Sequence, residues 1–216
     1  QILGSTGPLN LTDADISGTH AFVVEAPGLL AIDIEDFQNP QVVGEVAVSS
    51  TTGIKCTVHG SLALVTRSYF DSPYGPAEPG GLDVIDISDP TNLQMLGSVD
   101  TPLNVVGVAA QGNHAYLACT GYSTMPPPGS FKIVDISDPT NPWITGSVPI
   151  NTAFDVAIVG SMAYIAGGLD ELVLVDISDP YNPVILGTAV DEQGQEAELY
   201  AMDIVVSKMA GLVYVT

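Results

Sequence analysis

The 216-residue chain carries 25 acidic residues against four basic ones, and its net charge of −21 excludes a basic surface that could follow a phosphate backbone. Binding to an anionic membrane surface is disfavoured for the same reason, and no run of apolar residues is long enough to span a membrane. The hydrophobic share of 46%, with 22 glycines and 16 prolines, indicates a globular chain of many short elements joined by turns.

Four short apolar blocks follow one another and then repeat along the chain, at a spacing of roughly 40–50 residues. The blocks are rich in Val, Ile, Leu and Tyr and are bounded by Gly, Pro, Asn and Asp, which is typical of strands. A glycine separates the first block from the second, as expected for a tight hairpin. The third block ends in an aspartate, and these anchor residues are Asp33, Asp86, Asp135 and Asp176.

The repeat predicts an all-β fold, namely a β-propeller of four-stranded antiparallel blades in a single domain over residues 1–216. We expect blades at residues 11–48, 52–100, 103–149 and 152–190, and partial strands at 1–4 and 199–216. Partial blades leave exposed strand edges, a liability that a closed ring removes. We therefore expect the polypeptide to continue beyond Thr216 and to complete a larger ring.

The turn after each anchor is of the type Asp-Ile-Ser-Asp-Pro, in which an aspartate can accept a backbone N–H and proline fits the second turn position. These acids could also ligate Ca²⁺, but each turn offers only two of them. A structural role in the turn is the better explanation. In the first blade Glu35–Gln38 replaces the Ser-Asp-Pro sequence, so we expect a different turn there.

Two inserts interrupt the repeat between the second and third blocks, at Arg67–Gly81 and Thr120–Ser130. Both are rich in Pro and Gly, and we expect surface loops on one face of the propeller, with Gly80–Gly81 in a turn. Exposed aromatic side chains on loops supply binding area, although these rings could instead pack onto the blades. The contact candidates are Tyr69, Phe70, Tyr74 and Tyr122.

A third group of candidates lies on the first strand of each blade, which lines the central channel of a propeller. Asp155 and Asp203 occupy equivalent places, Asp13 or Asp15 matches them in the first blade, and Lys55 and Gly107 take this place in the second and third. Converging carboxylates could bind a metal ion or supply acid–base chemistry. The alternative is that they form hydrogen bonds with neighbouring backbone groups and join blade to blade.

The remaining polar and aromatic candidates have structural explanations. We interpret the histidines as solvated turn residues, because a metal site would require them to converge from different blades. The cysteines suit buried thiols, although one disulfide is possible. The tryptophan suits core or interblade packing. These residues are His20, His59, His114, Cys56, Cys119 and Trp143.

The strings Leu82–Asp86 (LDVID), Phe131–Asp135 (FKIVD) and Leu172–Asp176 (LVLVD), with the Ser-Asp-Pro turn after them, resemble the LVIVD-repeat family of prokaryotic surface proteins. This resemblance implies a β-propeller exported to the cell exterior. The family has no common catalytic residues that could be transferred to this chain.

We therefore expect a non-catalytic propeller, extracellular or at the cell surface, that recognises a protein or a glycan or acts as a scaffold. No cofactor is expected, apart from the possible Ca²⁺. Two alternatives remain open. One is a propeller hydrolase or lyase with an acidic site at the channel mouth. The other is a self-assembling subunit of a surface layer or an extracellular filament.

Overall fold

The chain forms short β-strands arranged as consecutive antiparallel sheets. The computed structural model describes residues 11–25, 28–48, 53–68, 79–121, 129–167, 172–188, 204–207 and 212–215. The strands are β1 (Leu11–Ser17), β2 (His20–Glu25), β3 (Gly28–Asp33), β4 (Gln41–Ala47), β5 (Gly53–His59), β6 (Leu62–Arg67), β7 (Gly80–Asp86), β8 (Gln94–Thr101), β9 (Asn104–Gln111), β10 (His114–Thr120), β11 (Gly129–Asp135), β12 (Trp143–Ile150), β13 (Asp155–Val159), β14 (Met162–Ala166), β15 (Leu172–Asp176), β16 (Val184–Thr188), β17 (Ile204–Ser207) and β18 (Leu212–Val215).

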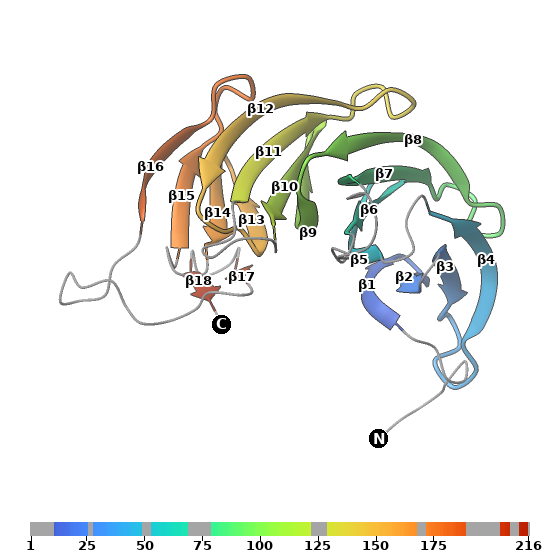
Figure 1. The fold of residues 1–216 in the computed structure, drawn as a ribbon. Coiled ribbons are helices and arrows are strands. Elements are labelled where there is room, and N and C mark those ends of the chain that lie inside the picture. Colours follow the sequence, from blue (N-terminus) through green and yellow to red (C-terminus); the bar gives the residue numbers. More distant parts are fainter. Residues whose placement is uncertain are drawn as a thin grey trace, which may run out of the picture.

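Each of the four complete sheets is a meander of four strands, in the orders β1-β2-β3-β4, β5-β6-β7-β8, β9-β10-β11-β12 and β13-β14-β15-β16. We call these sheets blades one to four. The blades follow one another around an arc, with the first strand of each on the inside and the fourth on the outside (Figure 1). Strands β17 and β18 form a separate hairpin beside β13. The all-β, blade-like prediction is confirmed. No helix in the described ranges is long and apolar enough to cross a membrane.

The hairpin between the first and second strands is alike in every blade. Gly18, Gly60, Gly112 and Gly160 have φ values of 59–63°, a backbone conformation that costs glycine little and other residues more. The chain reverses there within two residues, so the first and second strands pair in register. The glycine between the first and second blocks of the repeat is therefore enough to predict this turn.

The turn between the third and fourth strands is built by two aspartates. In blade two, Asp86 Oδ1 accepts the N–H of Ser88 at 2.8 Å, and Asp89 Oδ1 accepts the N–H of Thr91 at 3.0 Å. These are Asx turns, in which the carboxylate replaces a backbone acceptor. The same pairs of bonds recur in blades three and four. The predicted structural role of these acids is confirmed.

The expectation of a different turn in blade one is wrong. Asp33 Oδ1 accepts the N–H of Glu35 at 2.9 Å, and Asp36 Oδ1 accepts the N–H of Gln38 at 3.0 Å. The N–H of Asn39 bonds to the carbonyl of Asp36, as the asparagine does in the other blades. The two aspartates alone are enough to form the turn, so neither the serine nor the proline is required.

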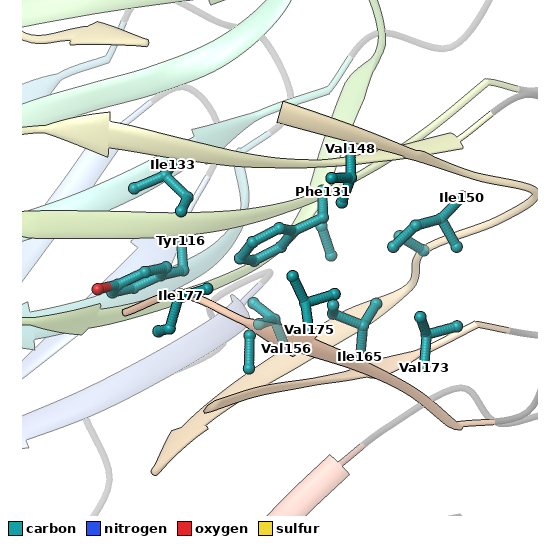
Figure 2. Packing of buried hydrophobic residues seen from close by; sticks show 13 residues of the cluster. Tyr116, Phe131, Ile133, Val148, Ile150, Val156, Ile165, Val173, Val175 and Ile177 are labelled. Carbon is teal, nitrogen blue, oxygen red and sulfur yellow. The ribbon is translucent and has the colours of Figure 1, made fainter. Parts of the chain in front are cut away.

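The hydrophobic core lies between adjacent blades. Tyr116, Phe131 and Ile133 of blade three pack against Ile165 and Val175 of blade four (Figure 2). The rings of Tyr116 and Phe131 stack with centroids 6.2 Å apart. Similar clusters join blade one to blade two and blade two to blade three. Blades two and three therefore each bury both faces against neighbouring blades, as in sheet-on-sheet packing.

The ends of both inserts belong to strands. Arg67 is the last residue of β6, and it pairs with Gly81 of β7. The expectation that Gly80–Gly81 form a turn is therefore wrong. These glycines permit close packing, because an added Cβ at Gly80 would lie 2.1 Å from the Leu103 carbonyl oxygen. Residues 69–78 of the first insert and 122–128 of the second lie outside the described residues.

Candidate functional site

The inner strands carry the predicted channel acids, and the structure places them against the next blade. Asp13 and Asp15 lie on β1, and Asp155 begins β13. Asp13 Oδ2 accepts the backbone N–H of Cys56 in blade two at 2.8 Å. Asp155 Oδ2 accepts the backbone N–H of Ile204, on β17, at 3.3 Å. These two bonds occupy equivalent positions in the repeat.

Asp15 adds a second contact between blades one and two. Its Oδ2 accepts the N–H of Val58 at 2.7 Å and lies 3.4 Å from the hydroxyl oxygen of Thr57. The acids on β1 thus bind alternate backbone N–H groups of β5. A sheet ladder cannot supply these bonds, because β1 and β5 belong to different sheets.

The other two positions of this ring differ in chemistry. The backbone N–H of Lys55 bonds to the hydroxyl of Thr66 in its own blade at 3.0 Å. Gly107 has no side chain, and an added Cβ there would lie 2.7 Å from the Cα of Asp155. Asp203 lies outside the described residues. The inner strands of blades three and four therefore approach each other closely, and Gly107 is what permits it.

These inner-strand carboxylates perform a structural task. Asp13, Asp15 and Asp155 accept backbone N–H groups of the following blade, which corresponds to the interblade alternative. A carboxylate that accepts buried N–H groups satisfies donors that would otherwise be costly to desolvate. Within the described ranges, no group of three or more His, Cys, Asp and Glu side chains could hold a metal ion.

The histidines lie at the hairpins, as expected, but one of them joins two blades. His59 Nε2 lies 2.7 Å from the carbonyl oxygen of Gly112 in blade three. Gln111 makes the corresponding contact, because its Nε2 donates to the carbonyl of Gly160 in blade four at 2.7 Å. His20 lies 3.2 Å from the Thr19 hydroxyl, within its own hairpin. The hairpin face is therefore linked from blade two to blade four.

The two cysteines are free and buried. Burial raises the pKa of Cys56 to about 12, with a further contribution from the nearby carboxylates of Asp13 and Asp15. Burial likewise raises the pKa of the Cys119 thiol to about 12. Both thiols therefore favour the protonated form near neutral pH, as is typical of buried structural cysteines.

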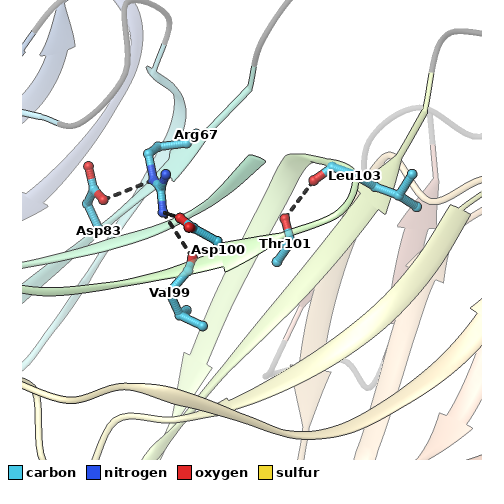
Figure 3. A network of polar contacts seen from close by, with 6 residues as sticks. All are labelled: Arg67, Asp83, Val99, Asp100, Thr101 and Leu103. Carbon is cyan, nitrogen blue, oxygen red and sulfur yellow. Dashed lines mark hydrogen bonds and ion pairs between the residues drawn. The ribbon is translucent and has the colours of Figure 1, made fainter. Parts of the chain in front are cut away.

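An ion-pair network that the sequence pattern did not predict lies at the root of the insert in blade two (Figure 3). Arg67 is buried, and its Nε lies 3.0 Å from Oδ1 of the fully buried Asp83. Its Nη2 lies 2.7 Å from Asp100 Oδ1 and donates to the Val99 carbonyl at 3.1 Å. An added Cβ at Gly81 would lie 2.3 Å from this Nη2, so the glycine makes room for the guanidinium.

One signal could have revealed this network. Arg67 on β6 and Asp83 on β7 are charged residues within apolar runs. The two strands pair with each other, so the two residues lie near each other. Buried charges are rarely tolerated without a partner, so two opposite charges in adjacent strands suggest a pair. The predicted contact residues Tyr69, Phe70, Tyr74 and Tyr122 lie outside the described residues.

Trp143 is an interblade residue on the outer rim. Its ring centroid lies 6.0 Å from that of Tyr181, which belongs to the Asp-Pro turn of blade four. Both rings remain about half exposed, at 47% and 57%. The expectation of interblade packing is confirmed for this tryptophan.

Four-stranded meanders arranged around an arc, with inner strands bonded to each other and cores between the sheets, define a β-propeller type of protein. The LVIVD repeat matches residues 77–101, 104–149 and 151–191, which is more than half of the chain. The chain belongs to the LVIVD-repeat family. No curated protein matches it.

Solved structures share the fold at low sequence identity. A functionally unknown protein from Desulfotomaculum acetoxidans is 16% identical, with a TM-score of 0.73, and the match covers 98% of this chain and 64% of that one. The computationally designed Ika8 protein is 12% identical, with a TM-score of 0.64, over 92% of this chain and 53% of that one. Hydrazine synthase from Kuenenia stuttgartiensis is 12% identical, with a TM-score of 0.58, over 74% and 50% of the two chains. This chain thus spans less than two thirds of each of these structures.

Proposed function

We propose that this protein is a non-catalytic recognition or scaffold module at the cell exterior, which contacts a protein or a glycan through its two inserts. The observation that carries the proposal is the ion-pair network at the root of the first insert, in which the buried Arg67 contacts the buried Asp83 and the exposed Asp100. Contact surfaces work best on rigidly supported elements. An arginine held by two carboxylates and a carbonyl gives the insert such a support.

The placement of the other polar groups supports the same proposal. The repeated aspartates form Asx turns, and the inner-strand acids accept interblade N–H groups. They are therefore occupied by structural bonds. Each insert joins the second strand of its blade to the third, so both leave the propeller on the face opposite the Asp-Pro turns. The inserts bring side chains to which the repeat assigns no structural role.

Binding to glycan and protein arrays tests this function. The wild type is compared with two variants, in which residues 69–78 or 122–128 are replaced by a short Gly-Asn hairpin. A Gln41→Ala variant, changed on the outer strand of blade one, serves as the control. We expect ligand signals that both the wild type and the control retain and that at least one insert variant loses. Signals that survive both replacements, or none at all, would contradict the proposal.

The cellular location is a separate part of the proposal. The acidic surface, with a net charge of −21, suits an exterior rich in cations, and the LVIVD resemblance points the same way. Fractionation of producing cells, with protease treatment of intact cells, tests it. Degradation of the protein in intact cells is expected, whereas complete protection until lysis would show that it is internal.

We further propose that the blades act as one domain, as the interblade cores and hydrogen bonds favour. A single cooperative unfolding transition, with coincident midpoints by circular dichroism and tyrosine fluorescence, is expected. Two separated transitions would show independent units.

A further inference from the structure

The Asp-Pro turns of blades two, three and four each rest on the outer strand of the blade before them. The contact is close, because an added Cβ on a glycine of that outer strand would lie 2.1–2.7 Å from the carbonyl oxygen of the turn proline. The pairs are Gly44 with Pro90, Gly97 with Pro139 and Gly146 with Pro180. The same backbone packing therefore supports all three contacts between the complete blades.

Two positions beside each of these contacts differ in chemistry along the chain. One is the first residue of the outer strand, and the other is the residue after the turn proline of the next blade. Gln41 and Gln94 begin the outer strands of blades one and two, and each bonds to the asparagine of its own turn. The turns that follow carry Thr91 and Thr140. Two of the three contacts thus form with polar side chains at both positions.

Between blades three and four, the same two positions hold Trp143 and Tyr181. Their ring centroids lie 6.0 Å apart, with an angle of 47° between the planes. The side chains remain exposed by 47% and 57%, on the outer rim to which β12 belongs (Figure 1). Large aromatic side chains of this kind are enriched in the contact surfaces of proteins. The aromatic pair is therefore a local addition that the packing of the other blades does not need.

A carboxylate lies beside the aromatic pair. Asp135 on β11 pairs directly with Trp143 on β12, so the two side chains share one face of the sheet, with Cβ atoms about 4.5–5.5 Å apart. Hydrogen bonds from the side chain and backbone of Ser137 lower the pKa of Asp135. These bonds leave room for another donor, because a carboxylate has about four lone-pair sites. Lys132 lies three positions away on β11, hence on the opposite face, and bonds to Ser147.

We propose that Trp143, Tyr181 and Asp135 form a binding site for an arginine side chain of a partner protein. A guanidinium group is planar, stacks on aromatic rings and pairs with a carboxylate, so it uses both features of the site. The net charge of −21 also favours a basic partner. This rim site goes beyond the proposed contact through the inserts and does not depend on it, since none of its residues belongs to an insert.

The chain has a single tryptophan, which makes the rim site directly observable by fluorescence. The full chain is titrated with a short, end-blocked peptide of alternating glycine and arginine, in about 150 mM salt to screen distant charges. A peptide with glutamine in place of arginine and a neutral chitin oligosaccharide are titrated in parallel. We expect a saturable change in emission with the arginine peptide only. No change with this peptide, or an equal change with the glutamine peptide or the sugar, overturns the proposal.

Substitutions distinguish the rim site from a general attraction between opposite charges. Asp135→Asn keeps an oxygen acceptor for the turn but removes the charge, and Trp143→Gln introduces the residue found in blades one and two. Each should weaken binding of the labelled arginine peptide, measured by anisotropy, roughly fivefold or more. Asp86→Asn, at the equivalent place in blade two, changes the net charge equally and should leave the affinity unchanged. Equal losses in the two aspartate variants would overturn the proposal.

Moving the aromatic pair to the neighbouring contact tests whether it does more than pack two blades together. The moved variant combines Trp143→Gln, Tyr181→Thr, Gln94→Trp and Thr140→Tyr. Asp86 lies opposite position 94 just as Asp135 lies opposite position 143, so the new place has the same carboxylate. We expect the moved variant to bind the arginine peptide within roughly threefold of the wild type. Circular dichroism confirms that each variant is folded.

The purely structural alternative gives a different result. Trp143→Gln would then lower Tm without changing the affinity for the arginine peptide, and the proposal would be wrong. A folded moved variant that fails to bind the peptide would likewise overturn it.

Discussion

Asp13 accepts the backbone N–H of Cys56 at 2.8 Å, and this bond joins the inner strands of two different blades. Asp155 makes the equivalent bond to the backbone N–H of Ile204, and this bond joins blade four to strand β17. A residue at the channel position thus serves as a clasp between sheets. It provides the hydrogen bond that a continuous ladder would have provided.

Replacing Asp13 by alanine should destabilise the protein by about 1–3 kcal/mol, because the Cys56 N–H loses its acceptor in a partly buried place. Asp13→Asn keeps an amide oxygen at this position and should cost less. Urea unfolding measures both variants. Glu45→Ala, on an exposed position of β4, is the control and should change stability by less than about 0.5 kcal/mol. Equal stability of Asp13→Ala and Glu45→Ala would show that the clasp contributes nothing.

Removing Arg67 should strongly destabilise the protein. Arg67→Met leaves the fully buried Asp83 without its ion-pair partner, and we expect a loss of about 3–5 kcal/mol. The double variant Arg67→Met with Asp83→Leu removes both charges and should recover much of that loss. Chemical denaturation of the two variants tests this. If the double variant is no more stable than Arg67→Met, the loss of stability comes from the changed side-chain packing and not from the loss of the ion pair.

His59 can be exchanged for glutamine with little effect, because Gln111 makes the same contact in the next blade. The side-chain amide of a glutamine at position 59 can donate to the Gly112 carbonyl as the imidazole of His59 does. His59→Ala should cost about 1 kcal/mol, the usual net value of one hydrogen bond. Thermal unfolding distinguishes the two variants. If His59→Gln is as unstable as His59→Ala, the histidine acts through its ring and not through this bond.

The Asx turns predict a loss of stability in acid. Hydrogen bonds from the backbone and side chain of Ser88 lower the pKa of Asp86, and bonds from Ser137 lower that of Asp135. A carboxyl whose pKa is lower in the folded protein stabilises it above the unfolded pKa, here 3.8, and this contribution is lost as the pH falls through the folded pKa. The urea midpoint should therefore decline below about pH 4. Asp86→Asn should flatten this decline, and an unchanged profile would contradict the assignment.

The buried thiols should resist modification until the protein unfolds. Burial raises the pKa of Cys56 and that of Cys119 to about 12, so the thiolate is scarce at pH 8. Ellman's reagent should react slowly with the native protein and rapidly, with both thiols, in concentrated urea. The folded state favours the protonated thiol, so this contribution to stability is complete below the ordinary pKa of 9.0 and is lost as the pH rises toward 12. Rapid native reactivity would show that a thiol is accessible.

The features predictable from sequence are those that short segments determine by themselves. The hairpin glycines and the paired aspartates of each Asp-Pro turn work within four or five residues, so the repeat alone indicated the blades. The blade-one turn was misjudged, because proline looked necessary when Asp33 and Asp36 were sufficient. The pair of Arg67 and Asp83 was missed because it depends on strand register, which brings together residues 16 positions apart. The bond from Asp13 to Cys56 spans 43 positions and depends on how two sheets pack.

The outer-strand glycines have a consequence for how such a chain can change over time. The Asp-Pro turn of one blade packs against the outer-strand glycine of the preceding blade, whereas the strand ends that lead into the inserts lie at the opposite ends of the strands. An insert can therefore lengthen, shorten or change its composition without moving a neighbouring blade. A glycine such as Gly44 has no such freedom, because any side chain there would push the next blade outward. Sequence changes can accumulate at one end of the blades while the contacts at the opposite end keep the blades in place.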